Sequence, residues 1–283
     1  MTTVAEALRE ATRRLESVSD TARLDAELLM AHALRVSRSN LLLRETGREA
    51  PAGFAALVER RERHEPVAYI RGRQEFYGRD FLVGPDVLIP RADSETTVEA
   101  ALAAFPAGDR VLDCGTGSGA LLLTVLSERP GSTGIGIDRS PEALAVAADN
   151  AERLGLSERC DLRFADWTES GWAARLGQFD LVVANPPYVE TSAELDRSVR
   201  DHEPAGALFA GPEGLDDYRV LIPQLPQLLA QDGAAVLEIG ASQADSVTEI
   251  AASCGFSAEL YCDLAERPRA LVLRLRTWQS AME

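Results

Sequence analysis

The sequence of 283 residues predicts an α/β protein with a mostly parallel sheet, preceded by a smaller helical domain. Three observations lead to this fold class. After about residue 95, apolar stretches of strand length alternate with helical stretches, which is typical of a parallel sheet covered by helices. A glycine-rich turn follows the first of these strands. Before about residue 75, the apolar residues recur with helical periodicity.

Residues 1–74 are expected to form the helical domain. Thr3 and Glu6 have the spacing of a capping box at the start of the first helix. The apolar residues that then share one face of this helix are Val4, Leu8, Ala11 and Leu15. A second helix, capped at residues 20–21, is expected to turn a different apolar set inward: Leu24, Leu28, Ala31 and Leu34.

A third helix is predicted to open at Pro51, because proline is favoured in a first helical turn. Its expected inward residues are Phe54, Leu57 and Val58, and its expected solvent-facing residues are Arg60, Arg61 and Arg63. Residues 75–90 follow as a linker that contains a β-hairpin, with strands at 75–78 and 81–84 bounded by glycine.

The second domain is predicted to span residues 91–283. Strands are expected at residues 111–113, 134–138, 160–164, 180–184 and 234–239, with a final antiparallel pair at 257–262 and 270–275. Helices are expected at residues 120–126, 141–154 and 215–229.

The composition excludes several classes of protein. A net charge of −16 argues against binding driven by nucleic-acid phosphates, which requires a basic surface. No lysine occurs, so Schiff-base chemistry and the P-loop lysine are excluded. The four cysteines show no C-x-x-C spacing and the three histidines are scattered, so no metal site and no disulfide framework is expected. Without a leader-like amino terminus or a long apolar run, the protein is expected to be cytoplasmic.

A turn with three glycines at alternate positions is the first candidate binding site. It consists of Asp113, Gly115, Thr116, Gly117, Ser118 and Gly119. Glycines there let backbone amides approach a ligand closely, as in a dinucleotide site, a nucleoside site or simply a tight turn. Asp113, two residues before the first glycine, can bind an ammonium group. This feature suits the methionine part of S-adenosyl-L-methionine better than a phosphate.

Two further positions favour a nucleoside ligand. Asp138 closes the second strand about twenty residues after the glycines, where a carboxylate can accept both ribose hydroxyls; alone, it would equally read as a helix cap. Asp166 and Trp167 follow the third strand, where the ring can flank an adenine and the carboxylate can accept its amino hydrogens. Taken alone, Trp167 could equally be a core residue.

The Asn-Pro-Pro-Tyr segment (Asn185, Pro186, Pro187 and Tyr188) follows the fourth strand. Ligands bind beyond the carboxyl ends of the strands in open α/β sheets, so this segment should face the same crevice as the glycine turn. Two prolines stiffen the backbone and remove two amide donors. The segment therefore offers carbonyl acceptors for an –NH₂ group, with Tyr188 as a wall.

Together, these motifs resemble the amino-methyltransferase branch of the S-adenosylmethionine-dependent superfamily. Within it, the chain is similar to the protein glutamine-N5 methyltransferases that act on bacterial peptide-chain release factors. The stretches that carry this resemblance are Asp25–Leu29, Glu65–Ile70, Glu75–Gly78, Leu88–Arg91, Glu203-Pro204 and Gly214-Leu215. The segment Pro90–Glu95 departs from the family pattern at Ala92 and Ser94.

The resemblance implies a Rossmann-like seven-stranded methyltransferase sheet. It implies that S-adenosyl-L-methionine, which becomes S-adenosyl-L-homocysteine, is held by the glycine turn, Asp138, Asp166 and Trp167, with Asn185 beside it. The Asn-Pro-Pro-Tyr segment would bind and activate the glutamine amide. The helical domain would recognise the release factor. Methylation of a ribosomal-protein glutamine and DNA adenine-N6 methylation are the rival activities, and a cofactor-binding protein without activity is a third alternative.

Overall fold

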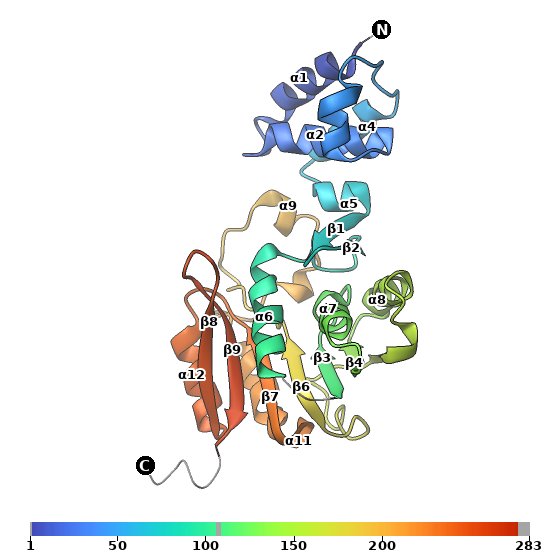
Figure 1. Ribbon diagram of the computed structural model, residues 1–283. Helices are drawn as coiled ribbons and strands as arrows, with labels where there is room; N and C mark the ends of the chain where they lie inside the picture. The colour runs from blue at the N-terminus through green and yellow to red at the C-terminus, as the bar shows by residue number, and fades with distance from the viewer. Residues whose placement is uncertain (1, 106–108, 277–283) are drawn as a thin grey trace. The chain divides into compact units, whose positions relative to one another are not determined.

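The computed structural model describes residues 2–105 and 109–276, which form two compact units (Figure 1). The helical unit combines Met1–Arg73 with a distant segment, Leu195–Glu203. The sheet unit comprises Gln74–Glu194 and Pro204–Glu283. The segment Leu195–Glu203 lies within the range 91–283 that was predicted for the sheet domain.

The helical unit is built from short helices around an apolar core. Its elements are α1 (Val4–Leu15), α2 (Ala22–Leu34), α3 (Arg38–Asn40), η1 (Leu41–Glu45), α4 (Phe54–Glu62), α5 (Val67–Arg71) and α9 (Arg197–Arg200). Helix α1 has the predicted capping box, in which Thr3 and Glu6 bond each other's backbone amides. Its buried residues are the four that its periodicity predicted.

The predicted inward face of α2 is only partly correct: Ala31 is buried and Leu34 packs against the core, but Leu24 and Leu28 do not belong to it. Leu24 is 38% exposed, whereas Ala26, Leu29 and Met30 are fully buried. Apolar residues surround most of this helix, so spacing alone does not define the face that meets the core. The structure also buries two acids of α2, Asp25 and Glu27.

The prediction that Arg61 on α4 faces solvent is wrong, because this residue is buried. Its guanidinium is buried and its Nε donates to Asp25 Oδ2 at 2.7 Å. A second donor, Nη2, reaches the carbonyl of Val18 at 3.4 Å. Thus Arg61 joins α4 to α2 through a buried ion pair, while Arg63 is exposed, as predicted.

The segment Leu195–Glu203 is tied to the end of α4 by two histidines. Arg197 Nη1 lies 3.1 Å from His64 Nε2, and His202 Nε2 lies 3.1 Å from the carbonyl of Arg63. His64 has a positive φ of 65°, so the chain turns sharply where these contacts form.

The predicted hairpin exists, but its strands begin earlier than expected: β1 is Arg73–Phe76 and β2 is Arg79–Leu82. Tyr77 and Gly78 both have positive φ and form a two-residue turn of the type that suits twisted strands. Gly78 therefore lies in the turn and Gly84 lies beyond β2, so neither glycine ends a strand. Phe76 and Phe81 pack edge to face, with ring centroids 6.1 Å apart.

Within the described residues, seven strands form one sheet in the order β5-β4-β3-β6-β7-β9-β8. Their bounds are β3 Arg110–Cys114, β4 Thr133–Asp138, β5 Cys160–Phe164, β6 Phe179–Ala184, β7 Leu229–Glu238, β8 Phe256–Cys262 and β9 Pro268–Leu275. The first five strands of this order are parallel to one another, and β9 runs antiparallel to both of its neighbours. The predicted fold class is confirmed.

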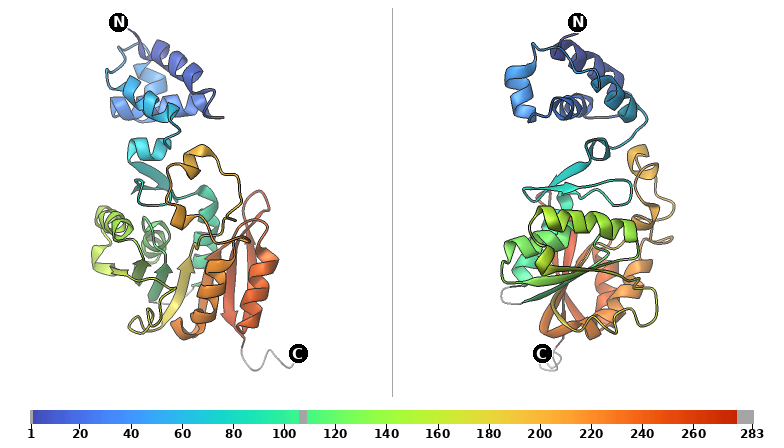
Figure 2. Two further views of the ribbon diagram at one scale, coloured as in Figure 1. Left: turned by 180° about the vertical axis from the view of Figure 1, so that it is seen from behind. Right: turned by 90° about the vertical axis from the view of Figure 1, so that its right-hand side faces the viewer.

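Helices cover both faces of this sheet (Figure 2). The elements are η2 (Ala92–Ser94), α6 (Glu95–Ala104), α7 (Ala120–Glu128), α8 (Pro141–Arg153), η3 (Ser157–Arg159), η4 (Ala205–Ala207), α10 (Asp216–Leu221), η5 (Ile222–Gln224), α11 (Leu225–Leu228) and α12 (Ala244–Ser253). Alternate strand residues supply two cores: Val111 packs with α6 and α7, and Leu112 packs with α10, α11 and α12. The sheet is thus the middle of three layers.

The helix expected at residues 215–229 is broken. Pro223 and Pro226 remove amide donors, and the chain forms α10, η5 and α11 in succession. Among the described residues, no helix is both long and apolar enough to cross a membrane.

We predict that Asp25→Ala destabilises the helical unit by roughly 3–5 kcal/mol, because it leaves the buried Arg61 guanidinium without its counter-charge. Urea unfolding followed by circular dichroism measures this change. Glu10→Ala is the matched control, since it removes an ion pair with Arg13 that is exposed on α1. Equal unfolding midpoints for the two variants would contradict the assignment.

Candidate active site

A cavity of about 330 Å³ lies at the carboxyl ends of β3, β4 and β6 in the sheet unit. The predicted site residues that line it are Asp113, Gly115, Thr116, Gly117, Ser118, Asp138, Asp166, Trp167, Asn185 and Pro187. Because the carboxyl ends of parallel strands lie at the same end of the sheet, residues far apart in the sequence meet there. Among the described residues that line the cavity, the predicted Gly119, Pro186 and Tyr188 are absent.

The glycine turn links the end of β3 to the end of β4. Gly115 and Thr116 donate backbone hydrogen bonds to the carbonyl of Ile137 at 2.9 and 2.8 Å. Gly115, Gly117 and Gly119 have φ values of 77°, 54° and 82°. These left-handed conformations favour glycine, which explains why the turn needs one at alternate positions.

Asp113 is buried at the base of this turn. Its Oδ2 accepts a hydrogen bond from the Thr116 hydroxyl at 2.7 Å. Its Oδ1 is also buried and has no partner with hydrogen-bond geometry among the described residues. Burial raises the pKa of Asp113 to about 7, although the Thr116 hydroxyl and the Leu122 amide act in the opposite direction. An ammonium group would supply the missing donor and the counter-charge.

Asp138 bonds to two backbone amides at the end of β4. Oδ2 accepts from Gly117 at 2.9 Å and Oδ1 accepts from Ser140 at 2.9 Å. The side-chain cap of α8 is Ser140, whose Oγ accepts from Ala143 at 3.0 Å. Asp138 therefore supports the glycine turn, and each oxygen keeps a lone pair for another donor.

Trp167 packs directly on the glycine turn. A Cβ added to Gly115 would lie 3.0 Å from two carbons of the indole ring. The indole Nε1 donates to Asp217 Oδ1 at 3.1 Å, which fixes the ring from the side of α10. Its neighbour Asp166 accepts hydrogen bonds from the amide and hydroxyl of Thr168. The ring is thus held as one wall of the cavity.

The Asn-Pro-Pro-Tyr segment leaves the end of β6 with both prolines buried. Beyond them, the carbonyl of Tyr188 accepts a hydrogen bond from Gln243 Nε2 at 3.1 Å, and the same amide donates to Gly214. These contacts hold the backbone of the segment. Asn185 remains partly accessible and lines the cavity.

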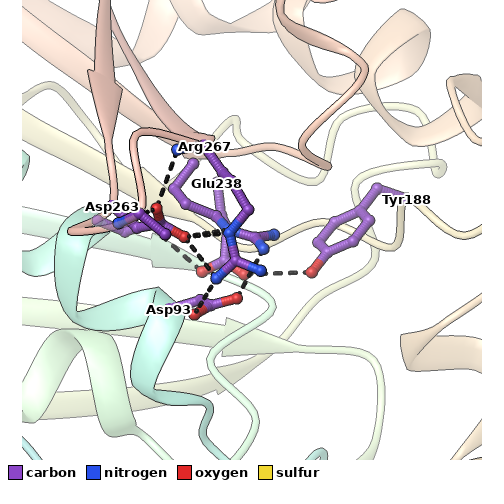
Figure 3. Close-up of polar contacts among 8 residues, drawn as sticks. Asp93, Tyr188, Glu238, Asp263 and Arg267 are labelled. Atoms are coloured by element: carbon purple, nitrogen blue, oxygen red, sulfur yellow. Dashed lines mark hydrogen bonds and ion pairs between the residues drawn. The ribbon is translucent and has the colours of Figure 1, made fainter.

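A buried acid that the sequence analysis did not single out, Glu238 at the end of β7, lies against this segment (Figure 3). Its Oε1 is 3.5 Å from the Tyr188 hydroxyl, and Oε2 is 3.3 Å from the Thr97 hydroxyl. Burial raises the pKa of Glu238, while the polar side chains of Ser94, Thr97 and Asn185 and the charge of Arg269 oppose that shift. Burial and the charge of Glu238 also raise the pKa of Tyr188.

An ion-pair network lies beside Glu238 (Figure 3). Arg269 Nη2 pairs with Asp93 Oδ2 at 2.7 Å, and Arg267 Nη2 pairs with Asp263 Oδ2 at 2.8 Å. Hydrogen bonds from Arg267 and from the turn amides lower the pKa of Asp263 to about 2. The network joins the loop before α6 to the turn between β8 and β9.

Of two residues at the site that were not singled out from the sequence, Glu238 and Asp217, only Glu238 carried a signal there. Glu238 is an acid that follows the apolar run 234–237 at the carboxyl end of β7, the side of the sheet where ligands bind in open α/β folds. Asp217 resembled an ordinary acid in the first turn of a helix, which the helix dipole favours. Its hydrogen bond to Trp167 depends on tertiary structure alone.

We predict that Gly115→Ala perturbs Trp167, whereas Gly117→Ala does not. Both changes place alanine at positive φ, at a cost of roughly 1–2 kcal/mol. Only the first crowds the indole, because no described atom lies within 4 Å of a Cβ at Gly117. With Trp172 and Trp278 replaced by phenylalanine, the fluorescence of Trp167 reports the difference. Identical spectra for the two variants would refute this packing.

Comparison with known proteins agrees with this geometry. A sequence profile described as the PrmC N-terminal domain matches residues 6–72, and one described as a methyltransferase domain matches residues 106–226. The release factor glutamine methyltransferase of Rhodospirillum rubrum is 43% identical over 264 residues, covering 90% of this chain and 79% of that protein. The protein of the same name from Cereibacter sphaeroides is 41% identical over 278 residues, covering 96% and 98% of the two chains. The chain belongs to the release factor glutamine methyltransferase family.

Proposed function

We propose that this protein transfers the methyl group of S-adenosyl-L-methionine to the side-chain amide nitrogen (N5) of the glutamine in the GGQ motif of peptide-chain release factors, and thereby modulates translation termination. Membership of the family supports the substrate. The observation that carries the chemistry is the carboxamide of Asn185, which lines the same cavity as the glycine turn.

The residues of the cavity fit the methyl donor. The unpartnered Oδ1 of Asp113 suits the ammonium of the methionine part. The remaining lone pairs of Asp138 suit the ribose hydroxyls, and Trp167 with Asp166 would flank the adenine. When bound there, S-adenosyl-L-methionine supplies an electrophilic methyl group and leaves as S-adenosyl-L-homocysteine.

The Asn-Pro-Pro-Tyr segment would prepare the glutamine amide. An amide nitrogen is a poor nucleophile, because its lone pair is delocalised into the carbonyl. In this proposal, Asn185 Oδ1 and the carbonyl of Pro186 accept the two amide hydrogens, and Tyr188 packs against the amide. These acceptors turn the lone pair toward the methyl group and stabilise the positive charge that develops on nitrogen. The methylated nitrogen is then acidic enough to lose its proton to water.

The helical unit is assigned to recognition of the release factor, because the four cofactor motifs lie after residue 110. A cytoplasmic location belongs to the same proposal. Glutamine methylation of a ribosomal protein and DNA adenine-N6 methylation use a similar –NH₂ acceptor, but the net charge of −16 disfavours DNA.

A parallel transfer assay tests the substrate. The full chain is incubated with radiolabelled S-adenosyl-L-methionine and either release factor, a release factor with its GGQ glutamine changed to alanine, ribosomal protein or duplex DNA. Label should enter the intact release factor alone. Label in the altered release factor would refute the assigned acceptor, and preferential labelling of ribosomal protein or DNA would select a rival activity.

We predict that Asn185→Ala lowers turnover by about a hundred- to a thousand-fold and leaves the affinity for S-adenosyl-L-methionine nearly unchanged. The acceptor that it removes acts most strongly on the charge of the transition state. Single-turnover assays at saturating methyl donor isolate this step, and calorimetry measures the affinity. Turnover within a few-fold of the wild type would show that the segment is structural.

We predict that the affinity for S-adenosyl-L-methionine rises on the order of tenfold between pH 5.5 and 7.5. With a pKa of about 7, Asp113 is largely neutral at the lower pH and can pair with an ammonium only after it loses its proton. Asp113→Asn should bind more weakly at pH 7.5 and show a flatter profile. Calorimetry across this range provides the measurement, and parallel profiles for the two proteins would remove Asp113 from the site.

A further inference from the structure

A buried carboxamide joins the Asn-Pro-Pro-Tyr segment to two other loops of the sheet unit. Gln243, directly before α12, has 8% of its surface exposed. Its Nε2 donates to the carbonyls of Tyr188 and Gly214, both at 3.1 Å. Its Oε1 accepts from the backbone amide of Gly240 at 3.0 Å. Since a backbone carbonyl only accepts and a backbone amide only donates, both ends of the carboxamide have a defined partner.

Two glycines leave the space that this carboxamide occupies. A Cβ added to Gly240 would lie 2.7 Å from Gln243 Oε1, and one added to Gly214 would lie 2.8 Å from Gln243 Nε2. Gly214 also has a positive φ of 67°, a conformation that favours glycine. Gly214 lies in one of the stretches that carry the family resemblance. The close approach of Gln243 explains why a glycine is needed there.

The contact with Gln243 holds one end of the Asn-Pro-Pro-Tyr segment. The other end continues β6, which is paired with β7 up to its last residue. In the peptide group after Tyr188, the carbonyl accepts from Gln243, and the amide of Val189 donates to the carbonyl of Leu208 at 2.8 Å. Without Gln243, this peptide group keeps one of the two bonds and is free to rotate about it.

A rotation at Tyr188 would reach the residues proposed to bind the substrate. The two prolines fix φ at successive positions, so the short segment has few bonds left that can absorb a displacement. A shift of the Tyr188 carbonyl is therefore passed on to the carbonyl of Pro186 and to the carboxamide of Asn185. A misplacement of about 1 Å at such groups can lower a rate about a hundred-fold.

We propose that Gln243 is a positioning residue for methyl transfer: by donating to the carbonyl of Tyr188, it fixes the segment whose acceptors orient the substrate amide. This inference rests on the proposed function of the Asn-Pro-Pro-Tyr segment. Gln243 is not one of the described residues that line the cavity. It therefore acts through the segment and not by touching the methyl donor.

Gln243→Met is the first test, because methionine keeps the length of the side chain but has no donor for the two carbonyls. The single-turnover rate at saturating S-adenosyl-L-methionine should fall about ten- to a hundred-fold. The affinity for S-adenosyl-L-methionine, measured by calorimetry, should stay within about threefold of the wild type. This split between rate and affinity is the signature of a positioning role.

Gln243→Asn is the second variant, and it keeps the proposal testable if Gln243→Met does not fold. Asparagine retains the polar carboxamide but is one methylene shorter, so it cannot reach the same three backbone partners. It should also slow transfer about tenfold or more with the affinity for the methyl donor preserved. A wild-type rate in either folded variant would overturn the proposal.

Asn150→Leu is the matched comparison, because Asn150 is another buried carboxamide of the sheet unit. Its Oδ1 accepts from the amide of Leu82 at 2.6 Å, and its Nδ2 donates to the carbonyl of Ser118 in the glycine turn at 2.9 Å. Its loss should lower mainly the affinity for S-adenosyl-L-methionine, about tenfold, with less than about a threefold effect on the single-turnover rate. If both variants lose rate and affinity in the same proportion, both carboxamides act only through packing, and the proposal fails.

The outcomes separate this inference from the proposed function. If Asn185→Ala transfers methyl normally, the proposed role of the segment fails, and the inference falls with it. If Asn185→Ala is nearly inactive but Gln243→Met has the wild-type rate, the proposed function stands and the positioning role alone is refuted. Thermal unfolding of each variant establishes that rates are compared between folded proteins.

Discussion

The hydrogen bonds from the glycine turn to the end of β4 are the interaction on which the candidate site depends. They fix the ends of two adjacent strands against each other through Ile137 and Asp138. The turn can make them only with backbone conformations that favour glycine. Asp113 is buried at the base of the turn. Because Gly115 has no side chain, the ring of Trp167 can pack directly against the backbone of the turn. Asp138 and the ring of Trp167 thus both contact the backbone of this one turn.

Two buried carboxylates, Asp113 and Glu238, lie at the carboxyl ends of strands of this sheet, and each has a distinct environment. Asp113 keeps an unpartnered oxygen beside the cavity. Glu238 lies within hydrogen-bond distance of the Tyr188 and Thr97 hydroxyls. Burial raises both pKa values, because it disfavours the charged form of each acid. Such groups concentrate at functional sites, because their charge becomes useful when a ligand arrives.

Most of the sheet could be predicted from the sequence, since each buried strand is a short apolar run that ends in a glycine or polar residue. The positions of Asp138 and Asn185 followed from one rule, the shared edge of parallel strands. The contacts of Glu238 did not follow, because Thr97 lies 141 residues away and only the folded sheet brings the two together. Arg61 was misjudged for the same reason: the carboxylate that lets it be buried lies on another helix. Periodicity describes one element at a time, so it cannot reveal such pairs.

The helical unit takes part of its structure from a segment that follows the Asn-Pro-Pro-Tyr segment by only a few residues, Leu195–Glu203. The unit is therefore discontinuous in the chain, and no single cut separates it from the sheet. A recombination event or an engineered fusion that transfers residues 1–73 alone would lose Arg197 and His202, the partners of His64 and Arg63. A change in the helical unit near His64 must therefore remain compatible with the segment Leu195–Glu203. Residues 1–73 alone are consequently not a self-contained module.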